Sequence, residues 1–213
     1  MPRKPNTELR RQQIVDGLLK AMAAQGYTGA TIQAIAKAAG LAPGLVHYHF
    51  HDKREILVAL VEQLTAYAST RFQSRAITAA TAHDRLRAYI DARLAYGADA
   101  NPDAVAAWVM IGAEAVRDPD VREVYQRVAT AELSLIRKLL RACLVERAKR
   151  VRKLDAFAAA LLAFIEGAFV LASNARSVVP AGFAADMANE LVERYIAGEA
   201  STATLRKSQE SRP

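Results

Sequence analysis

The chain has 213 residues, of which 52% are hydrophobic, so it can bury a sizeable core without disulfides or metals. It contains one cysteine, Cys143, which excludes an internal disulfide and suits a reducing compartment. The formal net charge is +7, and residues 1–55 hold eight lysines and arginines against four aspartates and glutamates. Such a localised basic excess attracts phosphate backbones.

Neither the N-terminal residues nor the most apolar run of the sequence indicates a targeting or membrane segment. The residues up to Glu8 carry the positive charge of a secretory signal but lack its apolar stretch. The most apolar later run, Ala156 to Ser173, is interrupted by Glu166, so we expect a buried helix rather than a membrane span. A soluble cytoplasmic protein without a membrane partner is therefore expected.

The first quarter of the chain predicts short helices with recognisable ends. The first helix runs from Thr7 to Gln25 and is stopped by the glycine-containing stretch 26–29. Thr31 is a natural N-cap for a second helix over 32–39, which Gly40 ends. A third helix tolerates Pro43 in its first turn and ends near residue 50, and a fourth starts at 51–53 and continues to about residue 73.

Helical patterns continue through the rest of the chain. They cover residues 84–98, 103–116, 119–148, 154–174 and 183–197, with Asn101-Pro102 and Asp118-Pro119 as N-terminal caps. The polar segment 199–213 is expected to be a disordered tail. The sequence thus predicts an all-α fold of about nine helices.

The segment from Thr31 to Phe50 has the pattern of a helix-turn-helix, in which two short helices are joined by a tight turn containing glycine. The residues expected to form the small core between the two helices are Ile35, Ala36, Leu41 and Val46. In such motifs the second helix enters the major groove of DNA and presents its N-terminal side chains to base edges.

This segment resembles the TetR/AcrR family of bacterial transcriptional regulators. The matching residues are Gly26-Tyr27, Thr31, Ile35-Ala36, Ala39-Gly40-Leu41, the run from Gly44 to Phe50, and Lys53-Arg54-Glu55. The chain departs from the usual pattern at Val46 and His47, where the family has leucine and tyrosine. The resemblance implies an N-terminal three-helix DNA-binding domain over 1–52 and a helical bundle for ligand binding and dimerisation over 53–198.

The resemblance also implies the residues that contact DNA. Thr31 and Gln33 would contact the backbone or a flanking base, and Lys53 would contact a phosphate. The residues over base edges would be Pro43, Gly44 and Leu45, and those between bases and phosphates His47 and Tyr48. Threonine, tyrosine and lysine side chains make such contacts, whereas Leu45 and Pro43 can make only apolar ones.

Several neighbouring residues have simpler roles. Phe50 and Tyr27 are expected in the core. The histidines at 47, 49 and 51 do not share a helix face, so neither a metal site nor a cofactor is expected. Arg10 and Arg11 could contact phosphate or be solvated, and the sequence favours neither reading.

The segment Trp108 to Ala115, with Asp118-Pro119, looks like the subgroup typified by the choline-responsive BetI regulators. Aromatic and apolar residues with two isolated carboxylates suggest a sensing pocket, formed by Tyr96, Trp108, Met110, Glu114, Tyr125, Phe164, Glu166 and Phe169. Glu114 and Glu166 lie in apolar helices, where a buried carboxylate needs a partner. That partner is either an arginine of the protein, which we favour, or a cationic ligand.

The family architecture implies a homodimer joined through the last two long helices. The expected face carries Phe157, Leu161, Phe164, Ala168 and Leu171 on one helix and Phe183, Met187, Leu191 and Tyr195 on the other. The alternative is that these residues are monomer core.

Together the patterns predict a transcriptional repressor that binds double-stranded DNA at an operator with the form of an inverted repeat. An unknown small-molecule effector would release it by shifting the fourth helix. The alternative is a DNA-binding factor without small-molecule control. We recognise no catalytic residue set, so an enzyme is not expected, and Cys143 is expected to be a packing residue.

Overall fold

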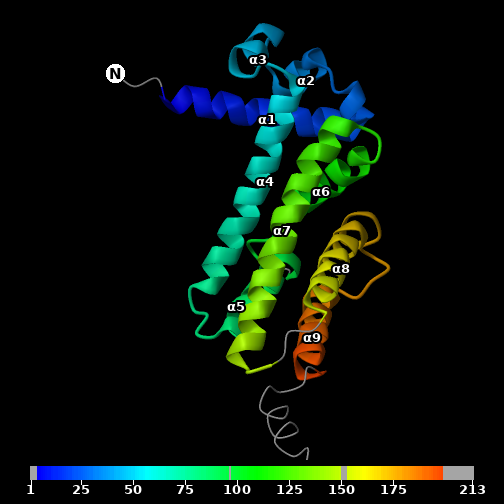
Figure 1. Cartoon of the computed structure of the whole chain (residues 1–213). Helices are drawn as coiled ribbons and strands as arrows, with labels where there is room; N and C mark the ends of the chain where they lie inside the picture. Colours follow the sequence, from blue (N-terminus) through cyan, green and yellow to red (C-terminus); the bar gives the residue numbers. More distant parts are fainter. Residues whose placement is uncertain (1–3, 96, 150–152, 199–213) are drawn as a thin grey trace, which may run out of the picture. The chain divides into compact units, whose positions relative to one another are not determined.

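The computed structural model describes residues 4–95, 97–149 and 153–198, and these contain nine helices and no strand (Figure 1). In chain order the helices are α1 (Lys4–Gly29), α2 (Ile32–Ala39), α3 (Pro43–His49), α4 (Lys53–Ala76), α5 (Ala82–Leu94), α6 (Pro102–Ala115), α7 (Pro119–Glu146), α8 (Leu154–Asn174) and α9 (Phe183–Gly198). The all-α prediction is confirmed. The predicted tail, 199–213, lies outside the described residues.

The helix ends differ from the predictions where the local signal was weak. The bounds of α2 and α8 are those predicted. α5 begins two residues earlier than predicted, because Thr81 and Asp84 form a reciprocal capping box at its start. It ends four residues earlier than predicted, at Leu94, and Ala95 has extended backbone angles. At the end of α1, Gly26 has φ 72° and ψ 170°, so the helix is interrupted there and one further turn follows.

Contacts between residues group the chain into two compact units. The first is the described part of Met1–Tyr67 with Asp103–Val128, and the second is the described part of Ala68–Pro102 with Ala129–Pro213. Helix α4 therefore contributes to both units, and α6 belongs with the N-terminal helices. The predicted division into a DNA-binding domain (1–52) and a ligand-binding and dimerisation domain (53–198) is a division by function, and it stays a prediction.

The first unit depends on a close crossing of α1 and α2. A Cβ placed on Gly17 would lie 2.7 Å from the carbonyl oxygen of Ile35 and 2.9 Å from Cβ of Ala39. Only glycine leaves room for this approach. The side chains of Ile14 and Leu18, on either side of Gly17, are completely buried, so the crossing lies in the core of the unit.

The second unit contains a buried arginine that joins α4 to the end of α5. The side chain of Arg71 is 8% exposed. Its guanidinium donates to the carbonyl oxygens of Ala92 (2.5 Å) and Ala95 (2.8 Å), and its Nε donates to Asp99 (3.0 Å). The guanidinium thereby satisfies carbonyls at the C-terminus of α5, where a positive charge is also favoured by the helix dipole. Arg75 pairs with the same carboxylate.

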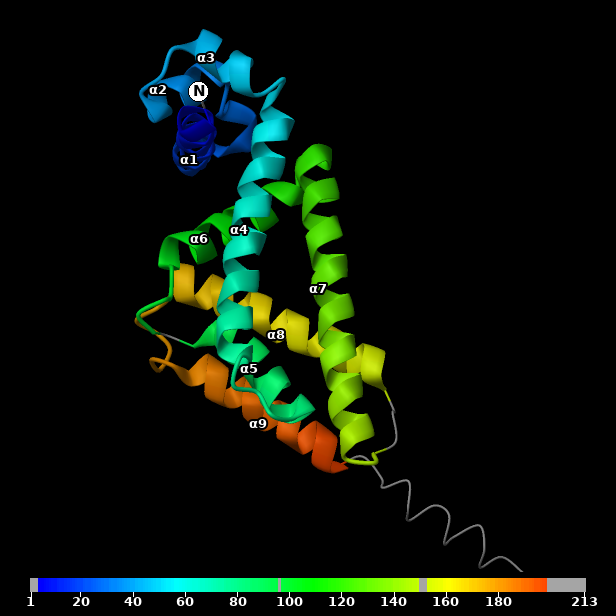
Figure 2. The same cartoon turned by 90° about the vertical axis from the view of Figure 1, so that its left-hand side faces the viewer.

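Helix α8 buries one face only, which corrects the prediction of a buried helix. Leu161, Ile165 and Phe169 are buried, whereas Val170 and Leu171 are exposed. By length and composition α8 is the one helix of the described residues that could cross a membrane, a criterion that apolar helices of soluble proteins also meet. The buried face lies against α5 and α9 (Figure 2).

Cys143 on α7 is completely buried, as expected of a packing residue. Burial raises the pKa of its thiol to about 11, because the thiolate would lose its hydration. At neutral pH the group is therefore a neutral thiol. Its neighbours on α7, Leu140 and Leu144, are also completely buried.

Replacement of Gly17 by alanine should destabilise the protein, although alanine has the higher helix propensity. The added methyl must push the α2 backbone away, at a cost of about 1–3 kcal/mol in the free energy of unfolding. Urea titration followed by far-UV circular dichroism measures this. Gly44→Ala is the matched control, because a Cβ there meets nothing within 4 Å. Equal stability of the two variants would contradict the close crossing.

Replacement of Asp99 by asparagine should lower stability at neutral pH and make no difference in strong acid. Hydrogen bonds from Arg75 and Arg71 hold the pKa of the Asp99 carboxyl well below its usual range. The ionised form therefore stabilises the fold above about pH 4, and this contribution is lost as the pH falls further. Urea titrations at neutral and acid pH test whether the free energies of unfolding of wild type and Asp99→Asn become equal in acid. Glu62→Gln, on the exposed side of α4, is the control.

Candidate nucleic-acid interface and buried carboxylate cluster

The helix-turn-helix has the geometry that its sequence predicts. The Thr31 side chain accepts a hydrogen bond from the N–H of Ala34 (3.2 Å), which caps α2. Gly40 adopts φ 68°, in the left-handed region that glycine tolerates, and the chain turns into α3. Ile35, Ala36 and Val46 are completely buried between the helices, and Leu41 is half-buried.

The residues predicted to contact DNA are almost all exposed. Thr31, Gln33, Pro43, Gly44 and His47 are exposed, and the Tyr48 side chain is 80% exposed. Leu45 is half-buried. These residues come from the start of α2 and from α3, which lie together beside α1 (Figure 2). Several side chains of the second helix of the motif are therefore exposed, while Phe50 and Tyr27 are buried as expected.

Lys53 differs from the other predicted DNA contacts because its ammonium group is already engaged. Nζ donates to the carbonyl oxygen of Tyr27 (2.7 Å) and lies 4.1 Å from the centroid of the Tyr27 ring. Burial lowers the pKa of Lys53, while the negative charges of Asp118 and Glu114 act in the opposite direction. Lys53 thus fastens the start of α4 to the end of α1, and its contact with phosphate stays a prediction.

The two arginines that the sequence left open have different surroundings. Arg10 donates to the side chain of Gln13 on its own helix (2.7 Å). Arg11 instead contacts α3 and α4: it donates to the carbonyl oxygen of His49 and pairs with Glu55. Sequence reasoning missed this role, because nothing in the local pattern of α1 distinguishes the two positions.

Among the predicted pocket residues, four belong to the first unit. The rings of Trp108 and Tyr125 stack, with centroids 4.8 Å apart, and Met110 is half-buried. The carboxylate of Glu114 lies 3.0 Å from the position that a Cβ on Gly26 would take. Glu114 therefore faces the end of α1, and its negative charge acts on Lys53. The arginine partner expected for Glu114 stays a prediction.

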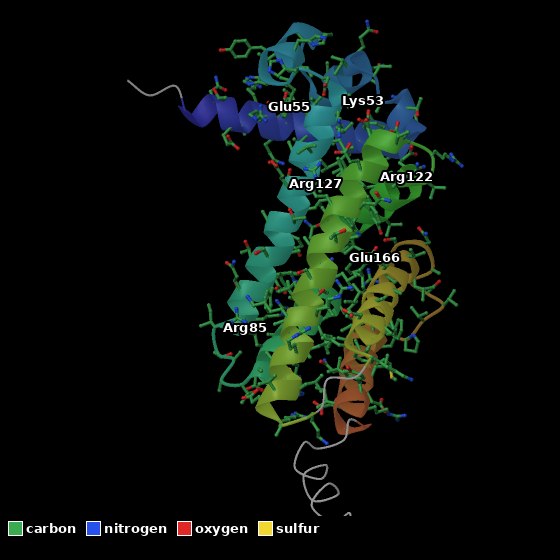
Figure 3. The ribbon with its side chains drawn as sticks, viewed as in Figure 1. Lys53, Glu55, Arg85, Arg122, Arg127 and Glu166 are labelled. Carbon is green, nitrogen blue, oxygen red and sulfur yellow. The ribbon has the colours of Figure 1, made fainter. Side chains whose placement is uncertain are left out.

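In the second unit, Glu166 on α8 (Figure 3) belongs to a group of polar and aromatic side chains that we call the Glu132 cluster. Its members are Tyr89, Arg93, Glu132, Glu166 and Phe169. The Tyr89 hydroxyl donates to Glu132 (2.5 Å), Arg93 Nε lies 3.2 Å from the same carboxylate, and the Arg93 guanidinium lies 5.3 Å from the Phe169 ring centroid.

The Glu132 cluster is largely buried and contains charged side chains. The side chains of Arg93 and Glu132 are 14% and 18% exposed, and Tyr89 is 1% exposed. Burial raises the pKa of Tyr89 well above its usual value, and the negative charges of Glu132 and Glu166 act in the same direction. A neutral phenol that donates to Glu132 is therefore the stable form at neutral pH.

Sequence reasoning predicted two members of this cluster, Glu166 and Phe169, and missed the other three. The signal available for two of them was the spacing of Tyr89 and Arg93, four residues apart on one helix face. Of the other predicted pocket residues, Phe164 is half-buried and Tyr96 lies outside the described residues.

Two family models match the chain. Residues 14–60 match the model of bacterial regulatory proteins of the TetR family, and residues 82–200 match the model of the C-terminal domain of BetI-type transcriptional repressors. The first match contains the helix-turn-helix, and the second contains every member of the Glu132 cluster.

Curated relatives support the same grouping. The regulator BetI of Rhizobium meliloti (strain 1021) is 33% identical over 125 residues, which are 58% of this chain and 61% of that protein. The aligned region thus spans less than two thirds of this relative. BetI of Burkholderia mallei (strain NCTC 10229) is 28% identical over 200 residues, which are 92% of this chain and 98% of that protein.

Solved structures have the same fold. A transcriptional regulator from Pseudomonas aeruginosa PAO1 aligns with a TM-score of 0.78 at 19% identity, covering 90% of this chain and 92% of that one. A regulator from Saccharomonospora viridis in complex with choline aligns with a TM-score of 0.67 at 22% identity, covering 90% and 97%. With matches at both ends, the chain belongs to the TetR family of transcriptional regulators and carries a BetI-type C-terminal domain.

Proposed function

We propose that this protein is a dimeric repressor that occupies an operator with α3 of each protomer and leaves it when a small organic cation binds. The observation that carries the DNA-binding part is the exposure of the predicted contact residues around a buried helix-turn-helix core. Tyr48 shows the contrast most clearly, because a ring 80% exposed lies two residues after the completely buried Val46.

The exposed side chains have the chemistry that a duplex requires. Thr31, Gln33, His47 and Tyr48 can exchange hydrogen bonds with phosphates and base edges, while Pro43 offers an apolar contact to a thymine methyl. The basic excess of residues 1–55 adds attraction for the backbone. Two copies of α3 related by a two-fold axis would recognise the two halves of an inverted repeat.

The Glu132 cluster supports an organic cation as the effector. Glu132 lies beside Arg93 and accepts from Tyr89, and the charge of Glu166 also acts on Tyr89, so two carboxylates lie in one largely buried region. Negative charge in a region of low dielectric attracts a cation that enters it. The aromatic rings of Tyr89 and Phe169 add faces that attract cations. The Saccharomonospora regulator, which has the same fold, was solved in complex with choline, an organic cation, and this supports the same class of ligand.

The exposed apolar side of α8 and α9 supports dimerisation. Val170, Leu171, Met187 and Leu191 are exposed, although Phe157 and Tyr195 stack on each other within one protomer at a centroid distance of 3.9 Å. The predicted dimer face is therefore divided between monomer core and exposed surface. Exposed apolar side chains grouped on two neighbouring helices favour association with a second copy.

Release requires that the effector bind the operator-competent and operator-incompetent states with different affinities. Helix α4 suits this coupling, because it begins at the anchored Lys53 in the first unit and ends in the second unit at Ala76, five residues after Arg71. A displacement of α4 on ligand binding would change the separation of the two recognition helices, and a dimer tolerates little change in half-site spacing.

Tyr48→Ala and Gly44→Ala should each weaken operator binding and leave the fold intact. Tyr48→Ala removes a DNA contact, and Gly44→Ala adds a methyl where α3 would approach the bases, so we expect a loss of about tenfold for each. The operator is first isolated by selection of genomic fragments and then footprinted. Fluorescence anisotropy gives the affinities, and thermal melting serves as the fold control. Unchanged protection of an inverted repeat by both variants would place the interface elsewhere.

Choline should raise the melting temperature and lower operator affinity at the same ligand concentrations. The neutral isostere 3,3-dimethyl-1-butanol should do neither, because it lacks the charge. Glu132→Gln and Glu166→Gln should each weaken choline binding by at least about tenfold, whereas Glu190→Gln, at an ion pair with Arg194 on the surface of α9, should not.

The two halves of the proposal fail separately in this experiment. Specific operator binding that no organic cation changes would favour a DNA-binding factor without small-molecule control. Equal stabilisation by choline and its neutral isostere would mean that the cluster does not recognise charge.

A further inference from the structure

The recognition helix α3 is too short to hold its own orientation. It has seven residues, and its N-cap is Ala42, whose side chain has no oxygen to accept a backbone N–H. One of its residues, Val46, is buried. Since isolated helices of this length are unstable in water, the direction of α3 must be set by contacts with the rest of the first unit.

Arg11 of α1 makes two contacts at the C-terminal end of α3 and a third with the first turn of α4. Its Nη1 donates to the carbonyl oxygen of His49, the last residue of α3 (2.5 Å). Its guanidinium carbon lies 3.9 Å from the centroid of the buried Phe50 ring. Its Nη2 lies 3.6 Å from the Glu55 carboxylate in the first turn of α4.

The chemistry of arginine fits this place. The last carbonyls of a helix lack partners within the helix and carry its negative end, so a cation that donates to them is stabilising. The planar guanidinium can lie against the Phe50 ring while its N–H groups point outward in the plane. A lysine has one compact ammonium group in place of the planar fork, which lets two different nitrogens of Arg11 reach the His49 carbonyl and Glu55 while the guanidinium carbon lies over Phe50.

The contact with Glu55 extends the arrangement to α4. Glu55 also accepts the N–H of His51 (2.8 Å), and its own N–H donates to Asp52 (2.8 Å). The turn between α3 and α4 is therefore fixed by the same carboxylate that pairs with Arg11. Figure 3 shows Glu55 and Lys53 at the end of α4 that adjoins α1.

We propose that Arg11 is a positioning residue that sets the orientation of α3 and thereby the sequence discrimination of the regulator. This inference rests on the proposed DNA-binding function. Arg11 acts through the His49 carbonyl, the Phe50 ring and Glu55, and the residues from Pro43 to Tyr48 make the contacts with bases. Its position on α1 makes it a specificity determinant outside the recognition helix.

Loss of this positioning affects specific binding more than non-specific binding. Contacts with base edges need defined donor and acceptor positions, so a small rotation of α3 weakens them. Contacts with phosphates carry no sequence information and depend on charge. A residue that itself binds phosphate would have the opposite signature, because its removal weakens all sequences alike and lowers the salt dependence.

The test compares Arg11→Gln with Arg10→Gln. The control also removes one positive charge, but from the neighbouring position, where the Arg10 side chain bonds only to Gln13 among the contacts described above. Dissociation constants are measured across a range of salt concentrations. The probes are the tightest duplex selected from a random-sequence library and a scrambled duplex of equal length and composition. We expect Arg11→Gln to lower the ratio of specific to non-specific affinity by about tenfold, and Arg10→Gln to leave the ratio unchanged.

Arg11→Lys separates positioning from phosphate binding, because it keeps the charge and loses the planar group. We expect it to lose discrimination as Arg11→Gln does, with a salt dependence equal to that of wild type. If Arg11→Lys discriminates as well as wild type, or if Arg11→Gln weakens both duplexes equally, the positioning role is overturned.

Glu55→Gln keeps the test decisive if Arg11→Gln fails to fold, as judged by circular dichroism. It weakens the pairing with Arg11 and should reduce discrimination in the same direction by a smaller factor. Unchanged discrimination in Glu55→Gln and Arg11→Lys together would overturn the proposal. If wild-type protein binds the selected and the scrambled duplex equally, the proposed function itself is overturned. If wild type and Arg11→Lys both prefer the selected duplex to the same extent, only the role of Arg11 is overturned.

Discussion

The surface that would meet DNA is built on a helix of seven residues, and a helix so short takes its direction from its surroundings. The first turn of α4 and the whole of α1 provide those surroundings. Two residues of that turn, Lys53 and Glu55, reach different parts of α1, one to the Tyr27 carbonyl and the other to Arg11. Residues two apart point to opposite sides of a helix, so α4 is fastened to α1 from both sides.

The same need for partners explains the charged residues inside the second unit. Arg71 is buried because the carbonyls of Ala92 and Ala95, at the end of α5, and the Asp99 carboxylate satisfy its guanidinium. Arg93 and Glu132 are largely buried beside each other, and Tyr89 donates a hydrogen bond to the same carboxylate. In both places a charged side chain leaves water because groups from other parts of the chain pair with it.

Local sequence signals predicted the parts of the fold that local chemistry determines. Thr31 and Gly40 bound α2 with a side-chain cap and a left-handed residue, so both ends were predicted correctly. The end of α5 was placed too late, because residues 95–98 contain two alanines and a tyrosine, which are compatible with a helix. In the structure Arg71 of α4 binds the carbonyl oxygen of Ala95, directly after the end of α5. Such long-range contacts leave no trace in the local pattern.

The residues of the candidate sites also fall into those that local patterns predict and those that depend on distant partners. The exposed residues of α2 and α3 could be predicted, because their spacing around Gly40 is shared across a family. The roles of Arg11, Arg93 and Glu132 could not, because each depends on a partner far away in the sequence. Glu114 was noticed for its apolar helix, but its position against Gly26 and its attraction for Lys53 depend on how α6 and α1 meet.

The state of Cys143 has a practical consequence for work on this molecule. The chain has a single thiol, and it is completely buried and neutral. Maleimides and other thiol reagents need an accessible thiolate. A cysteine introduced at an exposed position of α3 or α9 can therefore carry a fluorophore or spin label while the native thiol is left in place, and helix movements can be followed in an otherwise unaltered protein.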